Sequence, residues 1–239
     1  MKPTRALCFD LNETLVDLSG SQEAILRTCK RLAEQTGVDS ARLFEVNSEI
    51  WQSYWPGVED KWNLGVLSGS AVTLEAWRRA LIACGCDDES AAQFARKTHS
   101  QHASEALRLF DDVQEVLNLL KPQLSLALIT NGASDTQRNT LGILGIAPLF
   151  DAIIISGEVG IAKPDASIFA LALQTLGVEP EKTWHVGDSL STDVAGALDA
   201  GLTAVWLNRA GVIRKENDPR PDYEIRSLRE LTDLLSPEP

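Results

Sequence analysis

The fold of this chain is decided by the stretch Cys8-Phe9-Asp10-Leu11-Asn12-Glu13-Thr14-Leu15. The apolar residues before Asp10 predict a buried β-strand over 5–9, and the polar residues after it predict a turn. A carboxylate at the end of a buried strand is costly unless another group pairs with it. In open α/β sheets, ligands bind at this same end of the strands. Asp10 is therefore the first candidate for a functional residue.

A long segment with little strand character follows this strand. Apolar residues recur at helical spacing in four stretches, 21–34, 40–54, 72–83 and 89–109, and glycine or proline turn signals separate them. Such an insert is too large to be a single crossover helix. We therefore expect residues 17–109 to form a separate α-helical cap.

From Phe110 onward, helices and strands alternate. The expected strands are 124–129, 152–156, 183–186 and 204–207, and the expected helices are 112–121, 135–144, 165–176, 193–200 and 227–235, with a surface loop at 214–223. Alternation of this kind predicts right-handed βαβ units and a parallel sheet covered on both faces. We expect an α/β fold: a three-layer, Rossmann-like parallel-sheet core built from residues 1–16 and 110–239, with the helical cap inserted at 17–109.

Composition narrows the possible partners. The 239 residues include 34 acidic and 22 basic side chains, which gives a formal charge of −12 and argues against binding a nucleic-acid polymer. A small anionic substrate remains possible, because one local cation can reverse the sign of the field. The sequence contains no run of about 18 apolar residues, so no membrane span is predicted. The N-terminus lacks the apolar segment of a secretory signal, and the four cysteines show no C-x-x-C pattern, so we expect a cytoplasmic protein.

Polar residues cluster where the predicted strands end or where helices begin. The four groups are Asp10 with Asn12, Thr130 with Asn131, Lys163, and Asp188 with Asp193. Each group alone has an ordinary structural explanation: a helix cap, a Thr-Asn-Gly turn, or a helix that begins after a proline. Their joint occurrence in this order is much harder to explain by structure alone.

In these groups the chain resembles the haloacid dehalogenase-like hydrolase superfamily. The matching segments are 10–14, 129–132, 163–165, and 187–189 followed by Asp193, so the resemblance covers nearly the whole chain, including a helical cap (C1-type) after the first motif. The second half, 131–208, looks most like the phosphatases of the superfamily. The resemblance implies hydrolysis of a small phosphomonoester of the nucleotide, sugar-phosphate or phosphoglycolate type, with Mg²⁺ as the cofactor.

The resemblance also implies a nucleophile and a metal site. Asp10 would attack phosphorus and carry an aspartyl-phosphate. Asp10 and Asp188 would bind Mg²⁺ through carboxylate oxygens, with the backbone carbonyl of Asn12 as a third ligand, a donor set that suits this hard ion.

The remaining groups would hold the substrate. The hydroxyl of Thr130 and the backbone N–H of Asn131 would contact the phosphoryl group, and Lys163 would supply a positive charge beside it. Asp193 would accept a hydrogen bond from Lys163 or from a metal-bound water. As plainer alternatives, Lys163 pairs only with Asp165, and Asp193 only begins its helix.

One position departs from the phosphatase pattern. Two residues after the nucleophile, phosphatases of the superfamily carry an aspartate that transfers a proton, whereas this chain has Asn12. An amide neither gives up nor takes a proton at neutral pH. Because general acid–base help is typically worth ~10²–10⁴-fold in rate, we expect slow turnover of alkyl phosphates, unless another residue or a water substitutes.

Two other functions stay open. The superfamily's 2-haloacid dehalogenases also lack that aspartate and work without a metal, with an aspartate such as Asp10 as nucleophile. Their fourth motif usually lacks the Gly-Asp-Ser…Asp arrangement that this chain keeps, so the phosphatase ranks first. The third possibility is a catalytically weakened member that binds a phosphorylated ligand. We expect a monomer or a homodimer.

Within the cap, several aromatic residues are candidates for a substrate-facing wall. They are Trp51, Tyr54, Trp55, Trp62 and Trp77. Helical spacing with other apolar residues favours packing inside the cap for Trp51 and Trp77. Lys61 and Arg78 either meet an anionic substrate or face water, and His185 is expected to be a packed or hydrogen-bonded residue of a strand.

Overall fold

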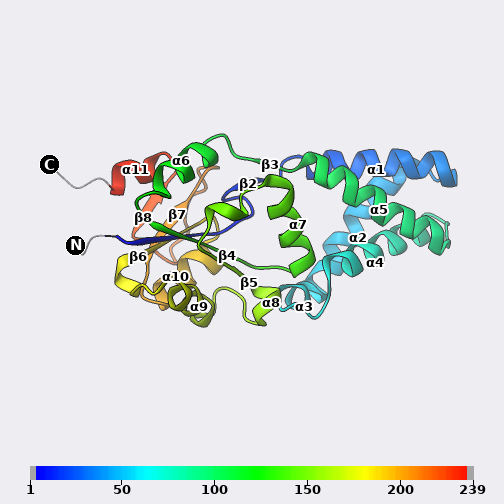
Figure 1. The fold of residues 1–239 in the computed structure, drawn as a ribbon. Helices are drawn as coiled ribbons and strands as arrows, with labels where there is room; N and C mark the ends of the chain where they lie inside the picture. Colours follow the sequence, from blue (N-terminus) through cyan, green and yellow to red (C-terminus); the bar gives the residue numbers. More distant parts are fainter. Residues whose placement is uncertain (1–3, 236–239) are drawn as a thin grey trace.

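The computed structural model describes residues 4–235, and the two ends of the predicted core range, 1–3 and 236–239, lie outside them. The described chain has two parts, one built on a parallel sheet and one built of helices, which lie end to end (Figure 1). Strands and helices of the sheet part come from both ends of the chain, and the helical part is inserted between β1 and β4.

Six strands form the central sheet. In spatial order they are β5 (Ala152–Ile155), β4 (Ser125–Thr130), β1 (Ala6–Phe9), β6 (Thr183–Gly187), β7 (Thr203–Leu207) and β8 (Tyr223–Ile225), and all neighbouring pairs are parallel. The sheet confirms the predicted α/β fold. Strand β8 was not predicted, because three residues with an exposed Glu224 at the centre carry no recognisable apolar run.

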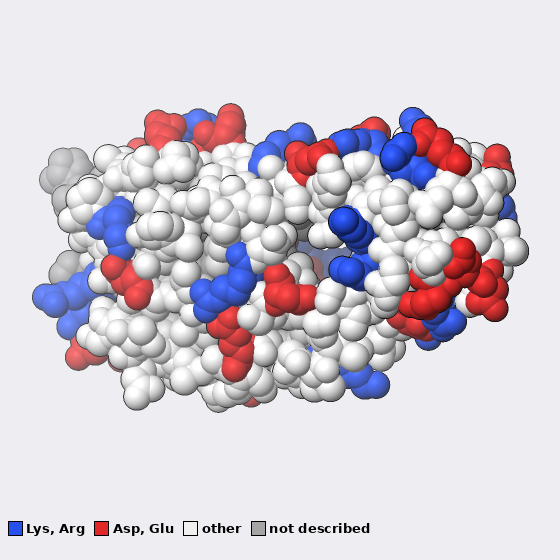
Figure 2. Space-filling model, turned by 45° about the vertical axis from the view of Figure 1, so that its right-hand side comes forward, with Lys and Arg blue, Asp and Glu red and all other residues white. Residues whose placement is uncertain are grey.

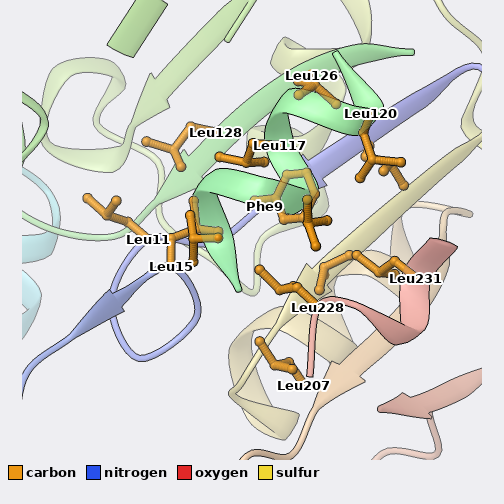
Figure 3. Packing of buried hydrophobic residues seen from close by; sticks show 14 of the residues in the cluster. Phe9, Leu11, Leu15, Leu117, Leu120, Leu126, Leu128, Leu207, Leu228 and Leu231 are labelled. Carbon is orange, nitrogen blue, oxygen red and sulfur yellow. The ribbon is translucent and has the colours of Figure 1, made fainter. Parts of the chain in front are cut away.

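Helices cover both faces of this sheet. Helices α6 (Val113–Leu120), α7 (Ser134–Leu144) and α11 (Glu230–Leu235) contribute to one hydrophobic cluster, and α9 (Ala166–Leu176) and α10 (Ala195–Asp199) contribute to another. In Figure 3 leucines from the first group of helices pack around Phe9. The three layers follow because both faces of the sheet are apolar.

Strand β1 connects the two clusters and fixes the direction of Asp10. Leu7 and Phe9 belong to the α6–α11 cluster, whereas Cys8 belongs to the α9–α10 cluster. Side chains alternate along a strand, so the next residue, Asp10, lies on the side of Cys8. The loop that leads into α9 carries Lys163 to the same side, where its ammonium meets Asp10.

The helical part has a hydrophobic core of its own. It contains α1 (Ser21–Thr36), α2 (Ser40–Tyr54), α3 (Glu59–Asn63), α4 (Gly69–Ala83) and α5 (Glu89–Ala106), with a 3₁₀ turn at Trp55–Gly57. Leu32, Leu43, Trp77 and Leu81 lie in one buried cluster that contains no residue of the sheet part. This packing favours the predicted separate cap, and the boundaries 17 and 109 stay a prediction.

The fourth predicted helix was wrong at its end. Helix α5 stops at Ala106, where Leu107 turns extended, and Arg108–Leu109 form strand β3 instead. This strand pairs antiparallel with β2 (Val16–Asp17), so the chain leaves and re-enters the sheet part as a two-stranded ribbon.

The predicted helix 193–200 also differs. A single π-helical turn, Leu190–Val194, precedes α10, because the N–H groups of Asp193 and Val194 both donate to the carbonyl of Ser189. The last helix begins at Glu230, and the four cysteines are free thiols. Among the described residues, no helix combines the length and the hydropathy that crossing a bilayer requires.

Candidate active site

The carboxyl ends of three neighbouring strands bring the predicted site residues together. Strand β1 pairs with β4 on one side and with β6 on the other. Asp10 follows β1, Thr130 ends β4 and Asp188 follows β6. Strands β1 and β6, which lead into Asp10 and Asp188, are therefore neighbours at the centre of the sheet.

A buried lysine sits between two buried carboxylates. The ammonium of Lys163 lies 2.6 Å from an oxygen of Asp10 and 2.6 Å from an oxygen of Asp193. Burial by itself lowers the pKa of Lys163, but the two carboxylates outweigh it and the pKa is raised above its ordinary value. Lys163 therefore carries a fixed positive charge between Asp10 and Asp193, and it pairs with Asp10 rather than with Asp165.

Asp193 is held from several directions. His185 Nε2 lies 2.9 Å from the same Asp193 oxygen that Lys163 contacts, and the backbone N–H of Ser189 donates to the other oxygen at 3.1 Å. A side chain at Gly187 would collide with Asp193, because an added Cβ would lie 2.2 Å from its carboxyl carbon. Burial alone would raise the pKa of Asp193, but Lys163 and His185 outweigh this effect. The pKa lies below its ordinary value, so this carboxylate stays ionised.

Asp188 is the less satisfied carboxylate. Its oxygen accepts one hydrogen bond from the hydroxyl of Thr14 at 3.2 Å, and its backbone carbonyl accepts one from the indole of Trp206 at 2.8 Å. Burial and the charges of Asp10 and Asp193 raise the pKa of Asp188 to about 7. A further positive charge beside Asp188 would therefore favour its ionised form at neutral pH.

These carboxylates fit a divalent cation. One oxygen each of Asp10, Asp188 and Asp193 lies within 4.8 Å of the other two. Oxygen donors are what Mg²⁺ prefers, and Lys163 neutralises only part of the charge that the three aspartates carry together. The arrangement fits the predicted metal ligands Asp10 and Asp188, and it brings Asp193 close to them as well.

Thr130 and Asn131 follow β4 as predicted. Thr130 is buried, and Asn131 bonds to the backbone of Lys163 twice: its Nδ2 donates to the Lys163 carbonyl at 2.9 Å, and its Oδ1 accepts from the Lys163 N–H at 2.8 Å. Gln137 in turn donates to the Asn131 carbonyl at 2.7 Å. The side chain of Asn131 thus fixes the loop that carries the buried cation, a contact that the sequence did not predict.

Asn12 stands in a tight turn two residues after Asp10. Glu13 takes a left-handed backbone with φ of 56°, and its N–H donates back to the carbonyl of Val16 at 2.8 Å. The side chain of Asn12 is half-buried and makes no hydrogen bond to any described residue. It lines a cavity, so it is free to meet a ligand.

This cavity of about 480 Å³ lies between the two parts of the molecule. Its walls come from the turn after β1, from α4 and α5 of the helical part and from α7 of the sheet part. A hollow is visible near the middle of Figure 2, where the two parts meet, and basic and acidic side chains border it. The volume is in the range of small-molecule sites.

Of the five aromatic candidates for a substrate-facing wall, Trp62 lines the cavity. Its ring lies against Gly132, where an added Cβ would come within 2.4 Å of it. Trp77 is buried in the helical core, as its spacing predicts. Arg78 pairs with Glu75 at 2.8 Å and does not line the cavity.

Two contacts hold the helical part against the sheet part beside this cavity. Asp135 at the start of α7 accepts hydrogen bonds from the backbone N–H groups of Gly69 and Ser70, the first residues of α4, at 2.8 and 3.0 Å. The hydroxyl of Ser156 donates to the carbonyl of Asn63 at 2.5 Å. Asp135 therefore caps a helix of the opposite part, which closes the cavity on one side.

Several of these residues could not be singled out from the sequence. Thr14 and Asp135 bond to groups that are distant along the chain, and only Thr14 lies in a recognisable motif. His185 contacts Asp193, eight residues further along. His185 was predicted to be a packed or hydrogen-bonded residue of a strand, and it is both: its ring centroid lies 5.0 Å from that of Phe169, and its Nε2 contacts Asp193. The sequence did not indicate that Asp193 is its partner.

Comparison with known proteins agrees with this geometry. The family model described as haloacid dehalogenase-like hydrolase matches residues 4–201. The chain belongs to the haloacid dehalogenase-like hydrolase family. It is 32% identical to the N-acylneuraminate-9-phosphatase of Mus musculus over 97% of this chain and 93% of that protein, which puts this hydrolase in the phosphatase-like branch.

Two solved structures of the family have similar folds. The putative hydrolase YfnB of Bacillus subtilis, in a structure bound to magnesium, has a TM-score of 0.72 with 26% identity and covers 98% of this chain and 100% of its own. A 2-haloacid dehalogenase from Pseudomonas syringae has a TM-score of 0.70 with 29% identity, over 97% of this chain and 98% of its own. This hydrolase is thus similar in fold to members with different chemistry.

Proposed function

We propose that this hydrolase cleaves a small phosphomonoester through an aspartyl-phosphate on Asp10. The observation that carries the proposal is the buried cluster at the end of β1. In this cluster the ammonium of Lys163 lies 2.6 Å from an oxygen of Asp10, and an oxygen of Asp188 lies within 4.8 Å of an Asp10 oxygen. The full-length similarity to an N-acylneuraminate-9-phosphatase supports a phosphorylated substrate.

In the first step, a carboxylate oxygen of Asp10 attacks phosphorus while the bond from phosphorus to the leaving oxygen breaks. Lys163 offsets the negative charge that two approaching anions bring together, and its pairing with Asp193 holds its ammonium in place. In the second step, a water attacks the phosphorus of the aspartyl-phosphate, which releases phosphate and regenerates the Asp10 carboxylate. The hydroxyl of Thr130 and the backbone N–H of Asn131 hold the phosphoryl oxygens in both steps.

Asp10, Asp188 and the backbone carbonyl of Asn12 would hold Mg²⁺ in this site. The raised pKa of Asp188 and the three converging carboxylates support a divalent cation there, as does the magnesium-bound structure of the similar protein YfnB. When bound, Mg²⁺ neutralises charge on the nucleophile and on the phosphoryl oxygens. Residues 17–109 would act as a cap that excludes water from the cavity.

Asn12 shapes the choice of substrate. Its side chain lines the cavity but has no proton to give, so the leaving oxygen departs as an anion or takes its proton from water. We therefore expect turnover to rise steeply as the leaving group becomes more stable as an anion.

Two observations support the dehalogenase alternative. Asn12 is compatible with a leaving halide that needs no proton, and the chain is similar to a 2-haloacid dehalogenase structure at 29% identity. The same Asp10 carboxylate would then displace halide from carbon. The cluster of Asp188 with Asp193 favours the phosphatase, because a second and third carboxylate beside the nucleophile serve a metal rather than a haloacid.

One experiment separates the three functions. Purified protein and the Asp10→Asn variant are incubated with a panel of phosphomonoesters, with Mg²⁺ or with chelator, and with 2-chloropropionate. We expect phosphate release that requires both Mg²⁺ and Asp10. Turnover that survives chelation or the loss of Asp10 would contradict the proposal, chloride release would establish the dehalogenase, and tight binding of a phosphate ester without turnover would establish the weakened binder.

A further inference from the structure

The cavity wall contains one cation, Arg96, that forms no ion pair with a described residue. Among the described residues that line it, three carry a formal charge: Asp17, Arg96 and Asp135. Asp17 pairs with Arg108 at 2.7 Å, and Asp135 accepts hydrogen bonds from three backbone N–H groups. Both acidic charges are thus satisfied by partners outside the cavity or along its edge.

Arg96 differs from both. Its Nε contacts the Gln93 side chain at 3.4 Å, and none of the carboxylates in the described part of the chain lies within ion-pair distance of its guanidinium. The side chain is half-buried in the cavity wall. An unpaired arginine in a partly enclosed cavity is poised to bind an anion, and its planar fork matches the two oxygens of a carboxylate.

The other polar residues of α5 that line the cavity are uncharged. Arg96, His99, Ser100 and Ser104 recur at helical spacing and line the cavity along one side of α5. His99 is held neutral near pH 7, because burial and the neighbouring His102 lower its pKa to about 4. The side chains of Thr73, Ser100, Ser104 and Asn139 make no hydrogen bond to any described residue, so they remain available to hydroxyl groups of a ligand.

We propose that Arg96 binds a carboxylate at the end of the substrate remote from Asp10, so that the preferred substrates are phosphate esters of hydroxylated carboxylic acids. This inference rests on the proposed phosphatase function and names its substrate class. A single guanidinium with neutral neighbours suits a carboxylate better than a second phosphate, because the nearby N–H groups at the start of α4 are already bonded to Asp135. Asn12 and Arg96 line the same cavity, so one ligand can reach both.

Two matched substrate pairs test this inference. The first pair is 6-phosphogluconate and sorbitol 6-phosphate, and the second is 3-phosphoglycerate and glycerol 1-phosphate. In each pair the first compound has a carboxylate where the second has a hydroxymethyl group. With Mg²⁺, we expect kcat/KM to favour the carboxylated member of at least one pair by about 10- to 100-fold, the range of a charge-assisted hydrogen bond. Arg96→Gln should abolish this preference mainly through KM.

The neighbouring exposed residue on the same helix supplies the matched control. Lys97→Gln removes the same charge from α5 outside the cavity lining and should keep the preference. Equal kcat/KM for both members of both pairs, a preference that survives Arg96→Gln, or a stronger preference for fructose 1,6-bisphosphate would overturn the inference.

Binding measured without turnover separates this inference from the proposed function. Calorimetric titration of the Asp10→Asn variant with the same pairs reports the contribution of the carboxylate even if no ester is hydrolysed. Tighter binding of the carboxylated member that is lost in Asp10→Asn/Arg96→Gln supports the subsite. Absence of hydrolysis in the wild type, including that of p-nitrophenyl phosphate, would count against the proposed function alone.

Discussion

Asn131 and Lys163 are joined by two hydrogen bonds between one side chain and one backbone, although 32 residues separate them in the chain. The amide of Asn131 satisfies both the N–H and the carbonyl of Lys163, which leaves the lysine side chain to reach Asp10 and Asp193. The end of β4 therefore positions the cation of a neighbouring loop.

Replacing Asn131 by alanine should lower kcat by about 10²-fold, because a small displacement of Lys163 misaligns the charge beside the reacting phosphorus. The loss should appear in kcat more than in KM, as expected for a positioning residue. The control is Asn118→Ala, an exposed amide on α6 that contacts Gln114 at 3.1 Å. Unchanged kcat in Asn131→Ala would show that Lys163 keeps its place without this clamp.

Replacing Asn12 by aspartate should raise phosphatase activity toward alkyl phosphates, by up to ~10²–10⁴-fold, because a carboxyl group can protonate the leaving oxygen and then activate water. The gain should be small for p-nitrophenyl phosphate, whose leaving group needs no proton. Steady-state kinetics with both ester classes measure the ratio, with Asn12→Ala as the control that adds no carboxyl group. No gain in a folded Asn12→Asp protein would show that the proton is already supplied elsewhere.

The pH dependence of stability should reveal Asp188. Its folded-state pKa of about 7 lies above the ordinary 3.8 of an aspartate, so between these values the folded protein keeps a proton that the unfolded chain releases. The stability of the metal-free protein should therefore fall as pH rises through this window, by at most about 4 kcal/mol. Asp188→Asn should remove the fall and raise the Tm at pH 8.

The same thermal unfolding series tests the metal site. Mg²⁺ should raise the Tm of the wild type at pH 8 and have little effect on Asp188→Asn, because binding to the folded state alone stabilises it. Asp87→Asn, an exposed residue of the helical part, is the control and should behave like the wild type. An equal Mg²⁺ shift in Asp188→Asn would place the cation elsewhere.

Replacing Gly187 by alanine should damage the site through Asp193. The added Cβ would lie 2.2 Å from the carboxyl carbon of Asp193, so the carboxylate must move and release Lys163 and His185. We expect a large loss of kcat together with lower stability. Gly142→Ala in α7 is the matched control: nothing lies within 4 Å of its Cβ, and an exposed helical alanine should stabilise by about 0.5–1 kcal/mol. Equal activity of both variants would contradict the crowding at Gly187.

Replacing Asp135 by alanine should loosen the contact between the two parts, because the first N–H groups of α4 lose their acceptor. We expect a higher KM and greater quenching of Trp62 fluorescence by acrylamide, measured against a Trp62→Phe background. Asp88→Ala removes a comparable cap within α5 itself and should cost about 1 kcal/mol in stability without changing KM. If both variants behave alike, the bond between the parts does not hold the cavity closed.

The sequence predicted the fold because its signals are local. Helical spacing fixed most of α1, α2 and α9, and the alternation of apolar strands with helices predicted the parallel sheet. It failed where a partner strand decides the conformation: Arg108 and Leu109 pair with β2 instead of extending α5, and Tyr223–Ile225 become a strand only beside β7. Segments of two or three residues are too short to show a helical or strand periodicity.

For the site, the sequence by itself placed Asp10 and Asp188 after predicted strands and Lys163 before a predicted helix, and the resemblance to the family implied that the three belong together. The structure does bring them together. Only the tertiary structure decided that Asn131 clamps Lys163, that His185 supports Asp193, and that Arg96 is the cavity cation without an acidic partner. The physical reason is that hydrogen bonds and ion pairs depend on distances of a few ångströms between segments that are far apart in the chain. Sequence spacing carries no information about those distances until the sheet and the helical part are packed.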